Sequence, residues 1–274
     1  MRQINPITSI FLGIIQGLTE FLPISSSGHL VLFQNLLGFQ EPELLLDVSL
    51  HLGTLLAVCL YFHSDLKYML METWKFTLEL YHSRKSLKHI NESPYASLAL
   101  WVLVGTLPTS LTGIAFRPSL ENFFGSITVV GTMLVFLGFI LATTKLMSKD
   151  YQGRNEVGLL SALAVGTAQG IALIPGISRS GTTIVCGIMC GLSRDFAARF
   201  SFLLSIPAVI GALVLLLSSE GWDNVALLPL VTGFISSALV GLTALKILMG
   251  MVRKGHLFYF APYCWALGLF IVLS

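Results

Sequence analysis

Two short polar stretches decide how this chain folds: FLPISSSGH at residues 21–29 and IPGISRSGTT at residues 174–183. Each interrupts an apolar region, residues 4–38 and 157–192, and leaves two pieces too short to cross a bilayer alone. Backbone broken by proline, glycine and serine survives at membrane depth only where protein buries it or where it lines a wet cavity. Each stretch therefore predicts a re-entrant hairpin made of two half-helices.

The composition places the chain in a membrane. Of its 274 residues, 54% are apolar and only 11% are charged, against about 25% charged in an ordinary soluble domain. The mean hydropathy is +0.81. This composition excludes a disordered chain, a nucleic-acid-binding protein and a typical cytosolic enzyme, so no nucleic-acid partner is expected.

Outside the hairpins, six apolar segments approach or exceed the roughly 20 residues that a membrane span needs. They cover residues 44–63, 95–116, 126–146, 200–218, 225–251 and 257–274. The predicted fold is therefore all-α: one integral membrane domain over residues 1–274, polytopic, with six transmembrane helices and two re-entrant helical hairpins. The polar segment at residues 63–93 predicts an amphipathic helix on the membrane surface, with a solvated linker as the alternative.

The two hairpins are related by an internal repeat. A shift of 153 residues matches seven of the seventeen positions that begin at Gly13, without a gap, and the matches include Gln16 with Gln169 and Ser25 with Ser178. We interpret the chain as a duplication with repeats at residues 1–147 and 157–274. Because three spans, an odd number, follow the first hairpin, the second hairpin enters from the opposite side. The repeat is therefore of inverted topology, and the hairpin tips can meet near the midplane.

The charges orient the molecule. One side collects nearly all the basic residues, and the positive-inside rule makes that side cytoplasmic. Both termini and the mouth of the first hairpin are then expected outside. The basic residues of the cytoplasmic side are Lys67, Lys75, Arg84, Lys85, Lys88, Lys145, Lys149, Arg154, Arg194, Arg199, Arg253 and Lys254. The other side carries Arg2 and Arg117 with Glu41, Glu43, Glu121, Glu220 and Asp223.

Two clear cases of a charged residue at membrane depth remain, Glu20 in the first hairpin and Arg179 in the second. Each costs roughly 2.5–3.5 kcal/mol there, so we expect the two charges to meet, either in a functional site or as a plain ion pair between the halves. Gln16 lies one helical turn before Glu20, on the same face. Glu20 is a candidate metal ligand or general base with the Gln16 oxygen beside it; the alternative for Gln16 is an interhelical hydrogen bond.

Hydroxyl groups surround these charges. Serines before a half-helix cap it, and the uncapped N–H groups with the positive end of the helix dipole attract an anion. Two such helix ends and one guanidinium suit phosphate better than carboxylate, because an arginine fork matches phosphate with two hydrogen bonds. Capping alone accounts for part of the hydroxyls and not for the arginine. The candidate residues are Ser25, Ser26 and Ser27 in the first hairpin, and Ser178, Ser180 and Thr183 in the second.

His29 follows the three serines and is the only histidine of the first break. An imidazole can attack as a nucleophile or transfer a proton near neutral pH, whereas a lone histidine on an apolar face is usually a packing residue. His51 lies in a predicted span one turn after Asp47. We interpret His51 as an interhelical hydrogen-bonding group.

These motifs resemble the two signatures of bacterial undecaprenyl-diphosphate phosphatases. QGLTEFLP at residues 16–23 with SSSGH at 25–29 resembles the first signature, and PGISRSGTT at 175–183 resembles the second. The resemblance extends over the whole chain. It implies a phosphoric anhydride hydrolase that converts undecaprenyl diphosphate to undecaprenyl phosphate and inorganic phosphate, which recycles the lipid carrier for peptidoglycan synthesis and confers bacitracin resistance. It also implies a multi-pass protein of the bacterial plasma (inner) membrane whose active site opens to the outer face.

Carried over by position, the resemblance assigns catalysis to Glu20, Ser26, His29 and Arg179, with Gln16 and the remaining tip hydroxyls around the substrate. It implies a divalent cation at Glu20, magnesium first and calcium as the alternative. Many members have glutamate where this chain has Gln16. The expected partners are a polyprenyl diphosphate lipid and the surrounding membrane lipids, with a homodimer as a further expectation.

Two choices stay open at the level of sequence. His29, Ser26 or a water molecule could attack the terminal phosphorus. Inverted repeats with discontinuous helices are also typical of secondary transporters, so a transporter or flippase of a lipid-linked or other phosphate-bearing substrate is the alternative function.

Overall fold

The computed structural model of the chain describes residues 5–39, 44–82, 87–116, 126–147, 151–219 and 226–273, together with residues 118 and 123. Within these ranges every regular element is a helix, apart from one isolated bridge between Arg154 and Leu192. The prediction of an all-α polytopic membrane protein is confirmed.

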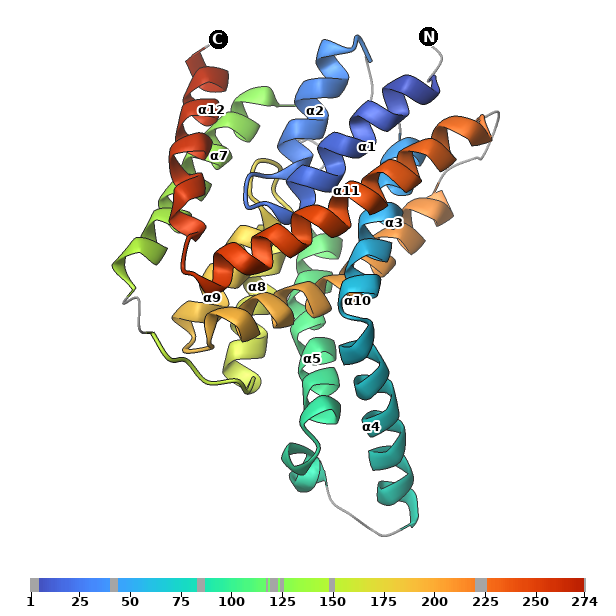
Figure 1. Cartoon of the computed structure of the whole chain (residues 1–274), viewed down its shortest axis with the longest axis vertical. Helices are drawn as coiled ribbons and strands as arrows, with labels where there is room; N and C mark the ends of the chain where they lie inside the picture. The colour runs from blue at the N-terminus through green and yellow to red at the C-terminus, as the bar shows by residue number, and fades with distance from the viewer. Residues whose placement is uncertain are drawn as a thin grey trace.

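The elements follow the chain in two sets (Figure 1). The first set comprises α1 (Pro6–Phe21), α2 (Ser26–Leu36), α3 (Leu44–Tyr61), α4 (His63–His82), η1 (Leu87–Glu92), α5 (Pro94–Ala115), α7 (Ile127–Ala142) and η2 (Thr143–Leu146). The second set comprises α8 (Leu159–Ile171), α9 (Arg179–Met189), α10 (Arg194–Ser219), α11 (Leu227–Arg253), η3 (Leu257–Phe260) and α12 (Ala261–Leu273).

Four helices of the described part are long and apolar enough to cross a membrane: α5, α7 with η2, α10 and α11. α3 and α4 would make a fifth span if the bent pair is counted as one. α3 alone has 18 residues, about 27 Å of helix against a hydrocarbon core of about 30 Å, and η3 with α12 is shorter still. The segments predicted as spans at residues 44–63 and 257–274 form helices over Leu44–Tyr61 and Leu257–Leu273. The total of six spans stays a prediction.

Both interrupted segments form helical hairpins. α1 and α2 open toward the end of the molecule where α1 begins and α12 ends, whereas α8 and α9 open toward the opposite end, and the two breaks meet in the middle (Figure 1). The breaks are shorter than the sequence predicts, because Ser25 and Ser178 already cap the next helix by accepting the N–H of the residue three positions later. The segment 26–29 and the segment 179–183 are therefore first turns of half-helices rather than loops.

Corresponding helices of the two halves pack in the same way. α1 crosses α11 closely, and a Cβ added to Gly17 would lie 2.8 Å from the Gly241 nitrogen. α8 crosses α5 closely, and a Cβ added to Gly170 would lie 2.7 Å from Thr112 Oγ1. Because α5 and α11 hold equivalent places after their hairpins, this exchange of partners is the pattern expected of an inverted duplication.

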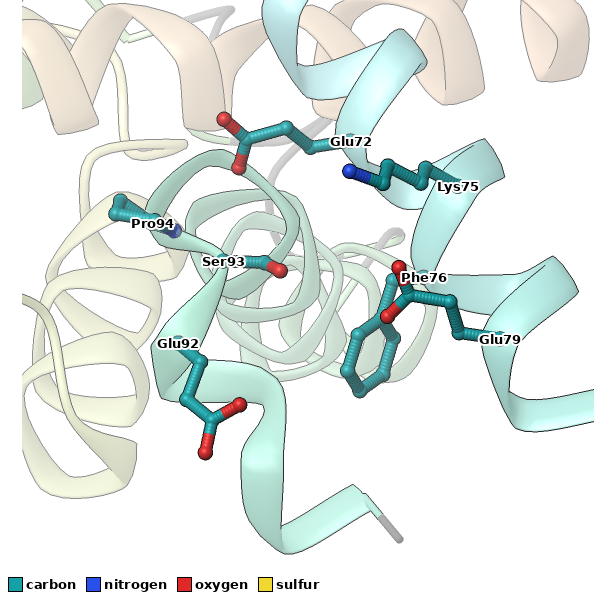
Figure 2. A pocket seen from close by; sticks show the side chains of 7 residues that line it. All are labelled: Glu72, Lys75, Phe76, Glu79, Glu92, Ser93 and Pro94. Atoms are coloured by element: carbon teal, nitrogen blue, oxygen red, sulfur yellow. The ribbon is translucent and has the colours of Figure 1, made fainter. Parts of the chain in front are cut away.

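The polar segment after α3 is a helix through most of its length. α4 turns 73° away from α3 and packs beside the first half of α5 (Figure 1). Near its end lies a hollow of about 320 Å³ between α4 and the start of α5, where Glu72, Lys75 and Glu92 project (Figure 2). Glu72 accepts the Tyr95 N–H at 2.9 Å. The expected helix is therefore present over His63–His82, whereas its location on the membrane surface stays a prediction.

Many charges that orient the chain lie outside the described residues. They are Arg2, Arg84, Lys85, Arg117 and Lys149 among the basic residues, and Glu41, Glu43, Glu121, Glu220 and Asp223 among the acidic ones. Of the rest, Arg199 pairs with Asp65 and Arg253 pairs with Asp195, so two of the predicted cytoplasmic charges tie helices together.

Candidate functional site at the hairpin tips

The two charges expected at membrane depth meet where the hairpin tips meet. Glu20 Oε1 accepts a hydrogen bond from Arg179 Nη2 at 2.5 Å, and the two side chains are only 9% and 17% exposed. Beside this pair, Ser180 Oγ donates to the Phe21 carbonyl at 2.8 Å. The last turn of α1 and the first turn of α9 are thereby held together.

The second carboxylate oxygen of Glu20 has partners from its own hairpin. Ser26 Oγ donates to Glu20 Oε2 at 2.6 Å, and Gln16 Nε2 donates to the same oxygen at 3.0 Å. His51 Nε2, from α3, lies 4.0 Å from it. Glu20 therefore collects three of the candidate residues around one buried carboxylate.

Gln16 keeps its oxygen free. The residue is fully buried, and its Oε1 has no hydrogen-bond partner among the residues that the structure describes. Its repeat mate Gln169 does make the interhelical bond proposed as the alternative, donating to Thr109 Oγ1 at 3.2 Å. Gln169 Oε1 is likewise without a hydrogen-bond partner among the described residues. The two glutamines differ in what their amide nitrogens meet, because only Gln16 has a carboxylate one turn further along.

Carboxylate and amide oxygens are suitable ligands for a hard cation. The orphaned Gln16 oxygen lies on the face that also carries Glu20, whose carboxylate is the usual kind of magnesium ligand. The described residues contain no group of three or more histidine, cysteine, aspartate or glutamate side chains that could hold a metal ion. Magnesium needs no such group, because it is commonly held by one or two carboxylates with substrate phosphates and water. The residues present therefore fit a magnesium ion.

His29 is held at both ring nitrogens. Its side chain is buried on the first turn of α2, with Nδ1 2.7 Å from the Ser25 carbonyl and Nε2 2.7 Å from the Tyr263 hydroxyl. Because a carbonyl oxygen can only accept, the neutral ring carries its proton on Nδ1, and Nε2 presents a lone pair. We assign the Tyr263 hydroxyl as the donor to that lone pair.

The hydroxyls of the second tip are mostly engaged within the protein. Ser178 Oγ caps α9 through the Gly181 N–H and lies 3.1 Å from Ser180 Oγ. Thr183 Oγ1 is fully buried, donates to the Arg179 carbonyl and lies 2.5 Å from Ser201 Oγ. The structure brings the predicted residues to the tip, where their hydroxyls hold the helix end in place.

The first tip uses its serines in a similar way. Ser25 Oγ accepts the Gly28 N–H at 3.3 Å and lies 3.3 Å from Ser27 Oγ. Ser26 is the exception, since its hydroxyl turns to Glu20 instead of to a helix end. Of the six predicted hydroxyl residues, Ser26 alone contacts a charged group of the site.

Arg179 and the helix ends leave room for an anion. Arg179 Nη1 is buried and has no hydrogen-bond partner within the part of the chain that the structure describes, although Nη2 is bonded to Glu20. The first N–H groups of α2 and α9 have no partner within their own helices, and both helix ends lie at the meeting point of the tips. This combination of donors suits a phosphate group.

Two members of the site escape the sequence motifs. His51 Nδ1 bonds to the Asp47 carbonyl at 2.8 Å within α3, and its approach to another helix is the 4.0 Å contact of Nε2 with Glu20. The predicted interhelical hydrogen bond of His51 stays a prediction. A histidine in the middle of an apolar span was the signal for it. Tyr263 lies in an apolar stretch with no neighbouring motif, and no signal in the sequence pointed to it.

Comparison with known proteins gives a consistent result over nearly the whole chain. A family profile described as "Bacitracin resistance protein BacA" matches residues 9–270. A protein of Desulforapulum autotrophicum named undecaprenyl-diphosphatase is 42% identical over 270 residues, which cover 97% of this chain and 96% of that protein. Proteins of the same name from Desulfatibacillum aliphaticivorans and Halothermothrix orenii are 43% identical over 269 and 267 residues, covering 97% and 96% of this chain and equal shares of their own.

Proposed function

The chain belongs to the family of the bacitracin resistance protein BacA, and we propose how its hairpin tips hydrolyse undecaprenyl diphosphate to undecaprenyl phosphate and inorganic phosphate. The reaction returns the lipid carrier to cell-wall synthesis. One observation carries the proposal: the buried pair of Glu20 and Arg179 joins the two tips and leaves one guanidinium nitrogen without a partner.

Arg179 and the two helix ends hold the pyrophosphate. Its Nη1 donates to an oxygen of the terminal phosphate, and the first N–H groups of α2 and α9 offset the remaining charge. Glu20 fixes the guanidinium in the required orientation, and Ser26 fixes Glu20. The isoprenoid tail lies along the apolar surface of the spans. Both tips come from one chain, so the homodimer expected from the sequence is not needed to complete the site.

His29 supplies the attacking atom. Its Nε2 lone pair forms a bond to the terminal phosphorus while the bond from that phosphorus to the bridging oxygen breaks, and undecaprenyl phosphate leaves with the bridging oxygen. Water then cleaves the nitrogen–phosphorus bond and releases inorganic phosphate. Ser26 is the weaker candidate, because the carboxylate that receives its hydrogen bond is already paired with Arg179 and is a poor base.

We further propose that a divalent cation, magnesium first and calcium as the alternative, binds beside Glu20. The Glu20 carboxylate and the free Oε1 of Gln16 would hold it. Such a cation supplies positive charge that offsets the pyrophosphate oxygens. Gln16, which stands where many family members have glutamate, would contribute a neutral ligand. Glu20 would then be the charged protein ligand of the cation.

The finer location is also a proposal: a bacterial plasma membrane, with the first hairpin opening to the outer face and both termini outside. It is supported by the basic residues gathered on the opposite side and by the common end at which α1 begins and α12 ends (Figure 1). In a variant without the four native cysteines, a membrane-impermeant maleimide should label Leu273→Cys on intact cells and spare Ser93→Cys. Labelling of Ser93→Cys alone would reverse the orientation.

Phosphate release by the purified full-length protein in detergent tests the enzymatic function against the transporter alternative. We expect release from undecaprenyl diphosphate by the unaltered protein and its loss in Arg179→Ala. If Arg179→Ala keeps full hydrolysis while transfer of the lipid across vesicles fails, the transporter interpretation replaces ours.

A further inference from the structure

The last helix reaches into the first hairpin. At the start of α12, the Tyr263 hydroxyl lies 2.7 Å from His29 Nε2, and the next residue, Cys264, directs its Sγ at the Pro23 carbonyl at 3.6 Å. Two consecutive side chains of α12 therefore contact the tip formed by α1 and α2. His29 and Tyr263 are 234 residues apart in the sequence.

The geometry of the contact orients the imidazole. The rings of His29 and Tyr263 are nearly parallel, 10° apart, with centroids 5.9 Å from each other. The hydroxyl meets Nε2, the ring nitrogen that carries the lone pair. The Ser25 carbonyl holds the other nitrogen at 2.7 Å, so the ring is fixed at two points.

Burial differs sharply between the two partners. His29 is 4% exposed, whereas Tyr263 is 45% exposed. A tyrosine that served only to fill space would be expected to bury its ring and leave its hydroxyl at the surface. Here the ring stays half exposed while the hydroxyl reaches a buried nitrogen, so the hydrogen bond, and not the packing of the ring, distinguishes this residue.

We propose that Tyr263 is a positioning residue for His29. Its hydroxyl donates to Nε2, aligns the lone pair, and releases it when the terminal phosphorus approaches. The tyrosine ring is 45% exposed, so the protein does not enclose it, and no covalent bond of Tyr263 changes. This inference rests on the proposed role of His29 as the attacking residue.

Tyr263→Phe removes the hydroxyl and keeps the ring, and Tyr259→Phe is the matched control. Tyr259 lies one turn earlier, in η3, and is 58% exposed. The first measurement is the nitrogen NMR spectrum of the full-length protein labelled at histidine, with His29→Gln to identify the His29 signals. We expect the Nε2 resonance to move downfield in Tyr263→Phe and to stay in place in Tyr259→Phe, while Nδ1 remains protonated in both.

The second measurement is phosphate release. Loss of one orienting hydrogen bond predicts a kcat about tenfold lower in Tyr263→Phe with little change in KM, and unaltered kinetics in Tyr259→Phe. An unmoved Nε2 resonance, or equal losses in both variants, would overturn the proposal. If the unsubstituted protein releases no phosphate, the proposed function is contradicted. The NMR shift in Tyr263→Phe would still establish the hydrogen bond.

Discussion

The two hairpin tips share one frame and carry different chemistry. In both, a serine caps the second half-helix by accepting an N–H at 3.3 Å: Ser25 in the first tip and Ser178 in the second. The repeat places Leu173, Arg179 and Thr182 at the positions equivalent to Glu20, Ser26 and His29. The duplicated frame thus provides two helix ends, and each tip adds charges that the other lacks. A pyrophosphate site needs both.

The tips also differ in backbone conformation. Ser25 has a positive φ of 70°, whereas the equivalent Ser178 has an ordinary φ of −81°. In the second tip the positive φ falls instead on Gly176, at 95°. A residue with a side chain pays roughly 1–2 kcal/mol for this conformation, which glycine avoids. The tip that carries His29 is therefore the more strained of the two.

The largest difference in activity is expected between His29→Ala and Thr182→Ala. The first substitution removes the nitrogen that we propose attacks the phosphorus and should lower kcat by roughly 10²–10⁴-fold. The second changes the repeat mate and should leave kcat within a few-fold. Steady-state phosphate release by both purified variants measures the difference, and similar losses in the two would mean that the tips are not chemically distinct.

A large effect on stability is expected at the charge pair. Arg179→Met leaves the Glu20 charge buried without its cationic partner, which should lower the unfolding free energy by about 3–5 kcal/mol and activity by about 10²–10³-fold. Glu20→Gln combined with Arg179→Met should recover most of the stability and none of the activity, since no uncompensated charge remains. Thermal melting and phosphate release on the same samples separate the two effects. Recovered activity in the double variant would show the pair to be structural only.

A smaller, selective effect distinguishes the two glutamines. Gln16→Ala should raise the magnesium concentration for half-maximal activity about tenfold, because the proposed cation site loses a ligand and Glu20 loses a neighbour. Gln169→Ala should leave that concentration unchanged and lower the unfolding free energy by about 1 kcal/mol. A magnesium titration of each variant makes the comparison, and an equal shift in both would remove Gln16 from the cation site.

The smallest effect concerns the capping serines. Ser25→Gly loses the cap and relieves the positive φ, so its stability should stay near that of the unaltered protein. Ser178→Gly loses its cap with no strain to relieve and should cost about 1 kcal/mol more. Melting temperatures measured in one detergent give the difference. A greater loss in Ser25→Gly would indicate that the backbone at Ser25 is unstrained.

The sequence predicts the frame well because its signals are local. Proline and glycine mark the breaks, serines mark the caps, and the scarcity of charge singles out Glu20 and Arg179, which the structure joins. The predicted odd number of intervening spans places the hairpins on opposite sides, and in Figure 1 the two hairpins open toward opposite ends of the molecule. The predicted break in the first hairpin is too long. It counts Ser26 and His29 as loop residues because polar residues are treated as non-helical, whereas α2 begins at Ser26.

Contacts between distant elements are what the sequence does not reveal. Tyr263 reaches His29 only through the way α12 packs against the first tip, and nothing near Tyr263 in the sequence marks it. Thr183 resembles a substrate ligand until its bond to Ser201 of α10 is seen. The free Nη1 of Arg179 and the free Oε1 of Gln16 likewise depend on which neighbours fold around them.

The central claim is that the first tip attacks the terminal phosphorus while the second tip binds the pyrophosphate. Rapid acid and base quenching of the reaction with terminally labelled undecaprenyl diphosphate tests this claim most directly. We expect a labelled protein intermediate that survives alkali and is lost in acid, as a phosphorylated imidazole is, that maps to His29 and that is absent from His29→Ala. An acid-stable label on Ser26, or turnover that proceeds unchanged in His29→Ala, would contradict the account.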